Sequence, residues 1–356
     1  MLNSACYSKV KQNMDEESNN QRIEYWDVAK GLGIICVMLG HLGCNQIDRV
    51  VFTFHMPLFF LISGWFLKTE ESLQEFVKKK TRRLLIPYYV TGCIICICLF
   101  LADIIRGMKE TVLQDMTDML IAIFYASCQP VSNHIKGIGA VWFFWALFWA
   151  MIIVKLFIKY KWCGIIIAIL AIVAYISSQI ICLPLSVQPG ICASIFVYLG
   201  IKFKQLNLKF NNKRFVIACG IIMAIEICFG IRVDMAKNRY DLGIISVIGS
   251  VCICYVIVCV AKVMVCFLPK LKRIIAFMGK YSLYMLCFHQ IEMRVFPWSV
   301  INMLLEKIGM SLYFNVVVSI IRIIGCSFLT YIWIEFLNIC QKGKEEHLKE
   351  IARLKR

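Results

Sequence analysis

Long apolar runs alternate with short polar connections along most of the chain. A helix needs about 20 residues to cross the hydrocarbon core of a bilayer, and about ten runs reach or approach that length. They cover residues 27–44, 50–67, 84–102, 138–158, 162–182, 188–203, 214–231, 242–264, 274–296 and 311–336. The pattern predicts an all-α, polytopic membrane protein with about ten transmembrane helices around a polar central cavity.

The polar ends of the chain give the expected domain organisation. Residues 1–24 are a polar tail, without the apolar core that a cleavable signal peptide requires. Residues 25–340 are expected to form the integral membrane domain, and residues 341–356 a basic tail.

Composition and charge support a membrane protein. The chain is 60% hydrophobic and 17% charged, with a mean hydropathy of +0.74, whereas soluble domains are about a quarter charged. The net charge of +17 does not indicate nucleic-acid binding, because the lysines and arginines lie in short runs between the apolar segments. They are roughly threefold enriched in alternate connections, as the positive-inside rule expects. This bias predicts a multi-pass protein of the cell membrane with both termini in the cytoplasm.

The run DVAKGLGIICVMLGH, residues 27–41, is apolar except for Asp27, Lys30 and His41. These three share one face of a helix, since eleven residues advance an α-helix by three turns and about 20°. Ionisable groups rarely face lipid, so this face is expected to line protein or a water-filled cavity. The spacing of Asp27 and Lys30 also allows an ion pair near the inner membrane surface. That pair would fit either interfacial charge neutralisation or a cavity that is polar at both ends.

Three of the five histidines are expected at one depth. His41 and His55 each lie seven residues from Asp48, the centre of the turn between the first two apolar segments. His289 lies about two-thirds of the way along the ninth segment, which runs outward. Each of these histidines could alone be an interhelical hydrogen-bond partner. Their common depth in the outer half of the membrane favours a site.

Several other features bear on function. Glu226 and Arg322 lie within apolar segments, and we expect them to be functional and to be each other's partners. Residues 103–137 form a long outer connection with helical periodicity, which suggests either a surface helix or a lid over the cavity. Most of the 19 cysteines lie in apolar runs, where a thiol behaves as a small hydrophobe. We therefore expect no metal site and no disulfide framework.

Ordered motifs carry a family resemblance. The runs YWDVAKGLGIICVMLGH, FHMPLFFLISGWFLK and KKKTRRLLIPYYV, followed by VWFFWALF and YSLYMLCFH, resemble the membrane-bound acyltransferase-3 family. The chain is most similar to the branch of fucose 4-O-acetylase and exopolysaccharide O-acyltransferases. The resemblance implies transfer of an acyl group from cytosolic acyl-CoA to a carbohydrate on the far side of the membrane.

The family motif of a basic residue, ten intervening positions and a histidine falls on Lys30 and His41. A second family motif, two arginines separated by two residues, is matched only as Lys80 and Arg83, with Arg82 in the same basic run. The expected catalytic group is His41, Lys30, Asp27, His55 and His289. His41 would act as a general base, or as a nucleophile through an acyl-histidine.

Lys80, Arg82 and Arg83 are expected to bind the phosphates of coenzyme A, although positive-inside anchoring would also explain them. On the acceptor side, amide, imidazole and aromatic groups could contact a sugar, although aromatic residues also form ordinary membrane belts. The candidates are Asn133, His134, Trp142, Trp145, Tyr281 and Tyr284, together with Arg322 and Glu226.

The sequence thus predicts an O-acyltransferase that uses acetyl-CoA, or a succinyl or other short acyl donor, and has no permanently bound cofactor. Nucleotide-linked, lipid-linked and polymeric sugars all fit as the acceptor. A sugar transporter or flippase is the competing class, because a charged pathway would serve transport as well. A membrane sensor without catalysis is a third possibility.

Overall fold

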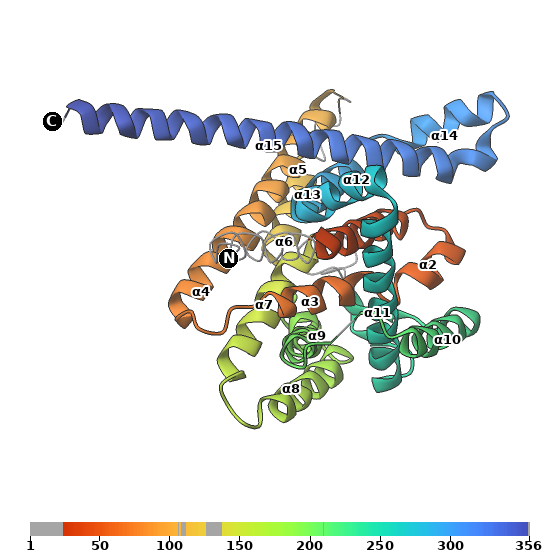
Figure 1. Ribbon diagram of the computed structural model, residues 1–356. Helices are drawn as coiled ribbons and strands as arrows, with labels where there is room; N and C mark the ends of the chain where they lie inside the picture. Colours follow the sequence, from red (N-terminus) through yellow and green to blue (C-terminus); the bar gives the residue numbers. More distant parts are fainter. Residues whose placement is uncertain (1–23, 106, 108–111, 126–136, 209, 355–356) are drawn as a thin grey trace, which may run out of the picture.

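The computed structural model describes residues 24–105, 107, 112–125, 137–208 and 210–354, and these are almost entirely helical (Figure 1). The first helix covers residues 24–39. The elements that follow are α2 (Asn45–Val51), α3 (His55–Trp65), α4 (Leu73–Lys80), the π-helix η1 (Thr81–Leu85), α5 (Ile86–Ile105), α6 (Val112–Tyr125), α7 (Trp142–Phe157), α8 (Cys163–Ser178), α9 (Val187–Gln205), α10 (Lys213–Phe229), β1 (Val233–Asp234), the 3-10 turn η2 (Met235–Lys237), β2 (Arg239–Tyr240), α11 (Ile244–Phe267), α12 (Pro269–Lys280), α13 (Ser282–Val295), α14 (Trp298–Lys307), the 3-10 turn η3 (Ser311–Tyr313) and α15 (Phe314–Leu354).

Four helical stretches of the described residues are long and apolar enough to cross a membrane, judged by length and composition. They are Asn45–Trp65, Leu73–Ile105, Ile244–Phe267 and Phe314–Gly343. Two further apolar helices, Trp142–Phe157 and Cys163–Ser178, are shorter. These helices identify a membrane protein, while the number of about ten spans and the orientation of the termini stay predictions.

Three predicted segments differ from the helices that form. The first helix ends at residue 39 rather than 44, where Gly40 and Gly43 lie in a turn and Gly43 has a φ of +70°. The second segment is interrupted at residues 52–54, between α2 and α3. The ninth is interrupted at Tyr281, between α12 and α13. Hydropathy averages over such breaks, because the residues on both sides are apolar.

The first helix and α12 cross in backbone contact. A Cβ atom added at Gly279 would lie 1.7 Å from the carbonyl oxygen of Asp27, and one at Gly31 would lie 2.1 Å from that of Ile275. Only glycine permits this approach at either position. The crossing brings the end of α12 and the start of α13 next to the polar face of the first helix.

The last helix, α15, runs across the other helices and extends well beyond them (Figure 1). Its buried residues recur every four positions, at Val318, Arg322, Cys326 and Thr330. Residues four apart share one face of a helix, so this stripe is the contact face. Thr330 bonds to the Met285 sulfur of α13 across it, at 3.3 Å. The stripe places the charged Arg322 inside the protein.

Helix α6 packs against α5. The Tyr88 hydroxyl donates to the carbonyl of Ile123 at 2.7 Å, while Leu113 and Phe124 stay exposed. Residues 126–136 of the same predicted connection lie outside the described residues. The α6 helix is therefore attached to the side of the helix bundle.

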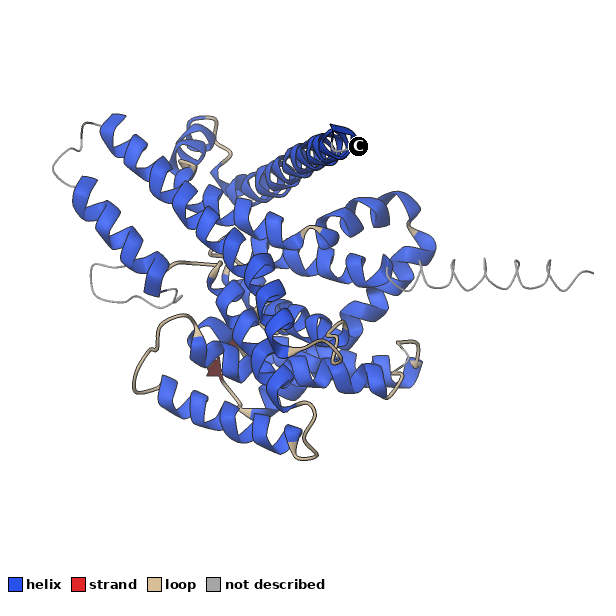
Figure 2. Ribbon diagram, turned by 90° about the vertical axis from the view of Figure 1, so that its left-hand side faces the viewer, coloured by secondary structure: helices blue, strands red, loops and turns tan. Residues whose placement is uncertain are grey.

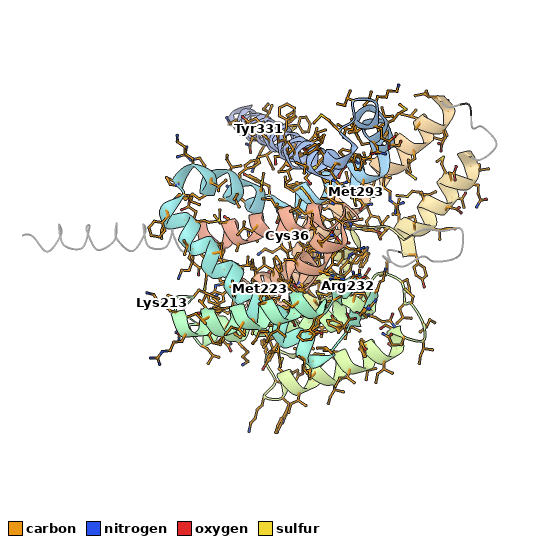
Figure 3. All side chains as sticks on the ribbon, turned by 90° about the vertical axis from the view of Figure 1, so that its right-hand side faces the viewer. Cys36, Lys213, Met223, Arg232, Met293 and Tyr331 are labelled. Atoms are coloured by element: carbon orange, nitrogen blue, oxygen red, sulfur yellow. The ribbon has the colours of Figure 1, made fainter. Side chains whose placement is uncertain are left out.

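A small antiparallel hairpin connects α10 to α11, with Val233 opposite Tyr240 and Asp234 opposite Arg239. Its two strands are visible in Figure 2. In Figure 3, Lys213 and Arg232 mark the two ends of the α10 segment, and Met293 of α13 lies towards the Arg232 end. The hairpin and the end of α13 therefore lie at the same end of the molecule.

Candidate functional site

Two cavities of about 450 Å³ each lie along the first helix. We call them the histidine cavity and the basic cavity. The polar and aromatic lining of the histidine cavity includes His41, Phe52, His55, Trp142, Asp234, Lys237, Gln290 and Arg294. The charged and hydroxyl-bearing lining of the basic cavity is Asp27, Lys30, Ser63, Lys80, Arg82, Arg83, Lys280, Tyr281, Ser282 and Tyr284.

The two cavities adjoin. Phe59, Phe143, Ser282 and Leu283 line both of them. At this boundary the rings of Phe59 and Phe143 lie next to each other, 5.8 Å apart between their centroids. Asp27 and Lys30 of the first helix therefore line the basic cavity, and His41, in the turn that follows the helix, lines the histidine cavity, so all three polar residues face a cavity as expected.

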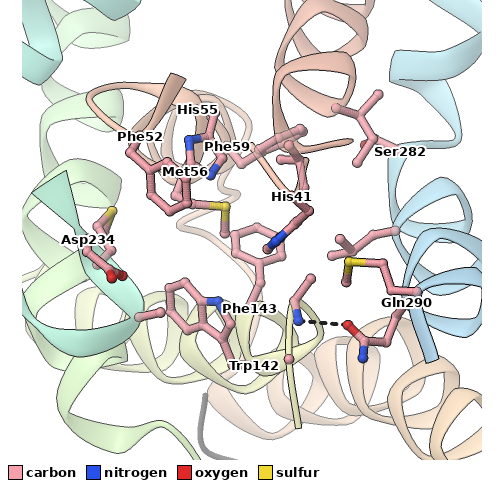
Figure 4. Close-up of a pocket in the computed structure, with 18 of the residues that line it drawn as sticks. His41, Phe52, His55, Met56, Phe59, Trp142, Phe143, Asp234, Ser282 and Gln290 are labelled. Carbon is pink, nitrogen blue, oxygen red and sulfur yellow. Dashed lines mark hydrogen bonds between the residues drawn. The ribbon is translucent and has the colours of Figure 1, made fainter. Parts of the chain in front are cut away.

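His41 lies just beyond the end of the first helix, in the turn that Gly40 begins. Its side chain is exposed and projects into the histidine cavity, as Figure 4 shows. The His289 ring lies next to the His41 ring, with 5.3 Å between the two ring centroids. The structure thus brings together residues that are 248 positions apart in the sequence, on the first helix segment and on α13.

His289 belongs to a buried charged cluster. Its Nδ1 lies 2.8 Å from the Glu292 Oε1, and the Arg322 Nε lies 2.6 Å from the same oxygen. The side chain of His289 is 0% exposed and that of Arg322 is 5% exposed. With Nδ1–H donating to the carboxylate, the Nε2 of His289 is left as an acceptor. This Nε2 has no hydrogen-bond partner among the described residues.

Arg322 also fixes the backbone that carries His41. Its guanidinium donates to the carbonyls of Met38 at 3.0 Å and of His41 at 3.2 Å. The same group lies over the indole ring of Trp298, 5.3 Å from its centroid. A planar guanidinium with several donors suits this role, because it can bind two carbonyls and a carboxylate at once. Arg322 therefore connects the positions of His41 and Glu292.

His55 is the third histidine of the predicted layer, and it also lines the histidine cavity. It begins α3, and its Nδ1 lies 2.5 Å from the carbonyl oxygen of Val51. That bond places the proton on Nδ1 and leaves Nε2 as an acceptor. His41 and His55 thus line one cavity and the His289 ring lies next to that of His41, while their common depth in the outer half of the membrane stays a prediction.

The basic cavity collects positive charge from three parts of the chain. Lys30 pairs with Asp27 at 2.6 Å, so the ion pair predicted from their spacing is present. The side chains of Lys80, Arg82 and Arg83 come from the end of α4 and the π-helix, and Lys280 ends α12. Clustered cationic donors of this kind bind phosphate groups.

Several residues predicted for the acceptor side lie elsewhere. Trp142 lines the histidine cavity, but Tyr281 and Tyr284 line the basic cavity. Trp145 packs among aromatic rings, with Trp149 stacked 6.2 Å away. Asn133 and His134 lie outside the described residues.

The predicted pairing of Glu226 with Arg322 is wrong. Arg322 pairs with Glu292 instead. Glu226 is 2% exposed and faces α11, where a Cβ atom at Gly249 would lie 1.7 Å from its Oε1. Both residues lie within apolar helices, and hydropathy alone does not show which helices are neighbours.

The sequence reasoning missed residues of α13 beyond His289. Glu292 lies one helical turn after His289, and that i,i+3 spacing of an acid and a histidine was a usable signal. Gln290 accepts from the Ala140 N–H at 2.7 Å, and Arg294 donates to the Gly137 carbonyl at 2.6 Å. These two bonds hold the loop before α7. Nothing local in the sequence indicates this long-range contact.

Two similarities to known proteins bear on the chemistry of this site. The family model described as an acyltransferase domain, that of the acyltransferase-3 family, matches residues 23–334. Nodulation protein NolL of Mesorhizobium japonicum is 26% identical over 153 residues, which are 39% of this chain and 36% of that protein. The chain therefore matches only about a third of the length of this curated relative. Because the family model covers most of the chain, including both cavities, the protein belongs to the membrane-bound acyltransferase-3 family.

Proposed function

We propose that the protein is an O-acyltransferase that transfers a short acyl group, first of all acetyl, from acyl-CoA to a carbohydrate hydroxyl. The observation behind this proposal is that the basic cavity, whose cationic side chains could bind phosphate groups, adjoins the histidine cavity. A donor in one cavity and an acceptor in the other would meet at the residues that line both. Family membership supports the acyltransfer chemistry.

The donor is proposed to occupy the basic cavity. Arg82 and Arg83 are exposed at its edge and also line a second surface depression with Lys78 and Lys79. They are therefore available to the phosphates of coenzyme A, for which charge-assisted hydrogen bonds are favourable. The pantetheine arm would then follow the apolar wall towards Phe59 and Phe143, with the thioester at the shared boundary.

His41 is the proposed general base. It accepts the proton of the acceptor hydroxyl as the hydroxyl oxygen attacks the thioester carbon. Collapse of the tetrahedral intermediate breaks the carbon–sulfur bond and releases the thiolate of coenzyme A, which then receives the proton from His41. In the alternative route His41 is the nucleophile: its ring nitrogen bonds to the acyl carbon as the carbon–sulfur bond breaks and the thiolate leaves. The acceptor hydroxyl oxygen then bonds to the acyl carbon as the carbon–nitrogen bond breaks, and the hydroxyl proton passes to the thiolate.

Ser282 is the proposed oxyanion stabiliser. It lines both cavities and is the first residue of α13. The first amides of a helix have no partner within that helix, and the helix dipole is positive there. The Ser282 hydroxyl and the amides of Ser282 and Leu283 therefore offer donors where negative charge develops on the thioester oxygen.

His289, Glu292 and Arg322 are proposed as positioning residues. They hold the His41 ring and backbone from the side away from the cavity. Glu292 pairs with the Arg322 guanidinium, which in turn donates to the His41 carbonyl, so the three residues form one connected support. The cluster would therefore keep His41 oriented towards the cavity.

We further propose the orientation that the charge bias predicts. The basic cavity would face the cytoplasm, where acyl-CoA is made, and the histidine cavity would face the outside of the cell membrane. The acyl group would then cross the membrane boundary by transfer between cavities. Cysteine labelling of single-residue variants in intact cells would test the side on which each cavity opens.

To test the function, the full chain in detergent or liposomes is incubated with acetyl-CoA and a panel of sugar acceptors. The release of free thiol from acetyl-CoA is measured over time. We expect acceptor-stimulated thiol release in the wild type and a loss of about 10²–10⁴-fold in His41→Ala, the range typical for a general base. Thermal unfolding of both proteins controls for folding. Equal rates would remove His41 from the chemistry.

The same experiment separates catalysis from transport. A transporter would move labelled sugar into sealed liposomes without releasing thiol from acetyl-CoA. Sugar uptake without thiol release would therefore contradict the acyltransferase proposal, and so would the absence of both activities with every acyl-CoA and acceptor.

A further inference from the structure

The hairpin between α10 and α11 forms one wall of the histidine cavity. Val233, Asp234, Met235, Ala236 and Lys237 all line it. No motif of the sequence analysis fell on these residues. They lie beside the site only because the hairpin folds back over it.

The hairpin packs into the core on one side and is bonded internally on the other. Val233 and Met235 are 1% and 2% exposed and belong to the main hydrophobic core. On the other side, the Asp241 carboxylate accepts from the Arg239 side chain at 2.7 Å and from the Arg232 amide at 3.0 Å. A short segment that is anchored this way can present a side chain at a fixed position.

Asp234 is the acidic side chain that this hairpin presents to the cavity. Its side chain is 22% exposed, and its Oδ2 lies 3.7 Å from the Lys237 ammonium, beyond hydrogen-bond distance. Figure 4 shows Asp234 beside Trp142 and Phe52, across the cavity from Gln290 and Ser282. The carboxylate therefore retains capacity to accept hydrogen bonds from a ligand.

The surrounding charges favour a hydroxyl-bearing ligand over a cation. Lys237 and Arg294 line the same cavity, so a positively charged ligand would meet two cations and one carboxylate. A neutral sugar would meet acceptors for its hydroxyls and apolar rings for its carbon–hydrogen faces. Aromatic rings such as those of Phe52 and Trp142 provide such apolar surface.

We propose that this hairpin is the acceptor-recognition element, and that the Asp234 carboxylate accepts hydrogen bonds from hydroxyls of a sugar ring packed against Trp142. The proposal rests on the proposed function, because it names the acceptor side of the same reaction. A site built to bind hydroxyls rejects analogues that lack them, so Asp234 would determine which sugar is acylated.

The test measures sugar binding without catalysis. The full-length His41→Ala protein in detergent is titrated with methyl α-L-fucopyranoside and methyl α-D-glucopyranoside by saturation-transfer NMR, with and without Asp234→Asn. We expect Asp234→Asn to weaken binding about 10- to 100-fold, as for loss of hydrogen bonds to a charged group. In the protein with His41 intact, the same change should raise the acceptor KM more than it lowers kcat.

Asp241→Asn is the matched control, since it is the same substitution in the same hairpin and its carboxylate is already bound by Arg239 and Arg232. Binding should stay within about twofold there, because the asparagine oxygen can still accept from the Arg232 amide and no contact with the ligand is lost. Equal weakening by both substitutions would overturn the role of Asp234, since the cause would be the shape of the hairpin.

The outcomes separate this inference from the proposed function. Unchanged sugar binding in Asp234→Asn, together with acyl transfer by the wild type, would overturn the hairpin assignment and leave the enzyme intact. Binding that depends on Asp234, without any thiol release by the wild type, would support the hairpin and overturn the acyltransferase proposal. Failure of the His41→Ala protein to bind either sugar would overturn the hairpin assignment.

Discussion

The two cavities hold their charged groups in different ways. In the basic cavity, Arg82 and Arg83 are exposed, and the pair of Asp27 and Lys30 is 20% and 23% exposed. In the histidine cavity, the groups behind His41 are buried and bonded to each other, with His289 at 0% and Arg322 at 5% exposure. Exposed charges are screened by salt, whereas buried ones are screened much less. Substitutions should therefore change donor binding in the first cavity, and stability and chemistry in the second.

The largest effect is expected from Arg322→Met. Removing one partner of a buried ion pair leaves the other charge uncompensated, which typically costs about 3–5 kcal/mol. The substitution also removes the bonds to the carbonyls of Met38 and His41. Thermal unfolding in detergent should show a much lower midpoint.

The control for this prediction is Glu292→Gln combined with Arg322→Met. With both charges gone, part of the lost stability should return, because an uncompensated buried carboxylate no longer remains. If Arg322→Met lowers the free energy of unfolding by less than about 1 kcal/mol, the ion pair would behave like an exposed one. That result would contradict the difference between the charged groups of the two cavities.

Ser282→Ala tests the boundary that the cavities share. Loss of one oxyanion donor typically lowers kcat about 10²- to 10³-fold. We expect the lower end of that range, since the amides of α13 remain, and we expect little change in the acetyl-CoA KM. Steady-state thiol release with a saturating acceptor measures both constants. A rise in KM with an unchanged kcat would mean that Ser282 contributes to binding only.

Arg82→Gln with Arg83→Gln should act on donor binding alone. Exposed charge-assisted contacts to phosphate contribute modestly, so we expect the acetyl-CoA KM to rise about tenfold at low salt. The difference from wild type should shrink as salt is added, because the Debye length falls to about 3 Å at 1 M. A salt-independent loss of kcat would contradict this assignment.

The smallest effect is expected from Glu226→Gln. Glu226 is buried between α10 and α11, and it does not line either cavity. The acceptor KM and kcat should stay within about twofold of wild type, as for substitutions away from the site. A large rise in acceptor KM would instead support the role in substrate binding that the sequence predicted.

Part of the site could be read from the sequence because it depends on helical geometry and hydrophobicity. Asp27 and Lys30 lie three residues apart on the first helix, and His41 and His55 are equally far along the chain from Asp48. The closeness of the three histidines was predicted from that symmetry and from the position of His289. These predictions needed only distances along the chain.

The rest depended on which helices touch. The apolar periodicity of α15 does not identify α13 as its neighbour, so Glu226 was chosen as the partner of Arg322 in place of Glu292. Similarly, Tyr281 and Tyr284 were candidates for the acceptor side, yet around the break before α13 they line the basic cavity. A helix break inside an apolar run has no hydropathy signal.

The sequence by itself determined that the protein is helical, enters a membrane and has a polar face on its first helix, because local periodicity and apolar length decide these properties. Only the tertiary structure decided that Arg322 holds Glu292 and the His41 backbone, that Ser282 lies between the cavities, and that the hairpin at Asp234 forms a wall. Each of these contacts joins residues far apart in the chain. They depend on how the helices pack against each other, through close backbone approaches at glycines and through stripes of buried side chains.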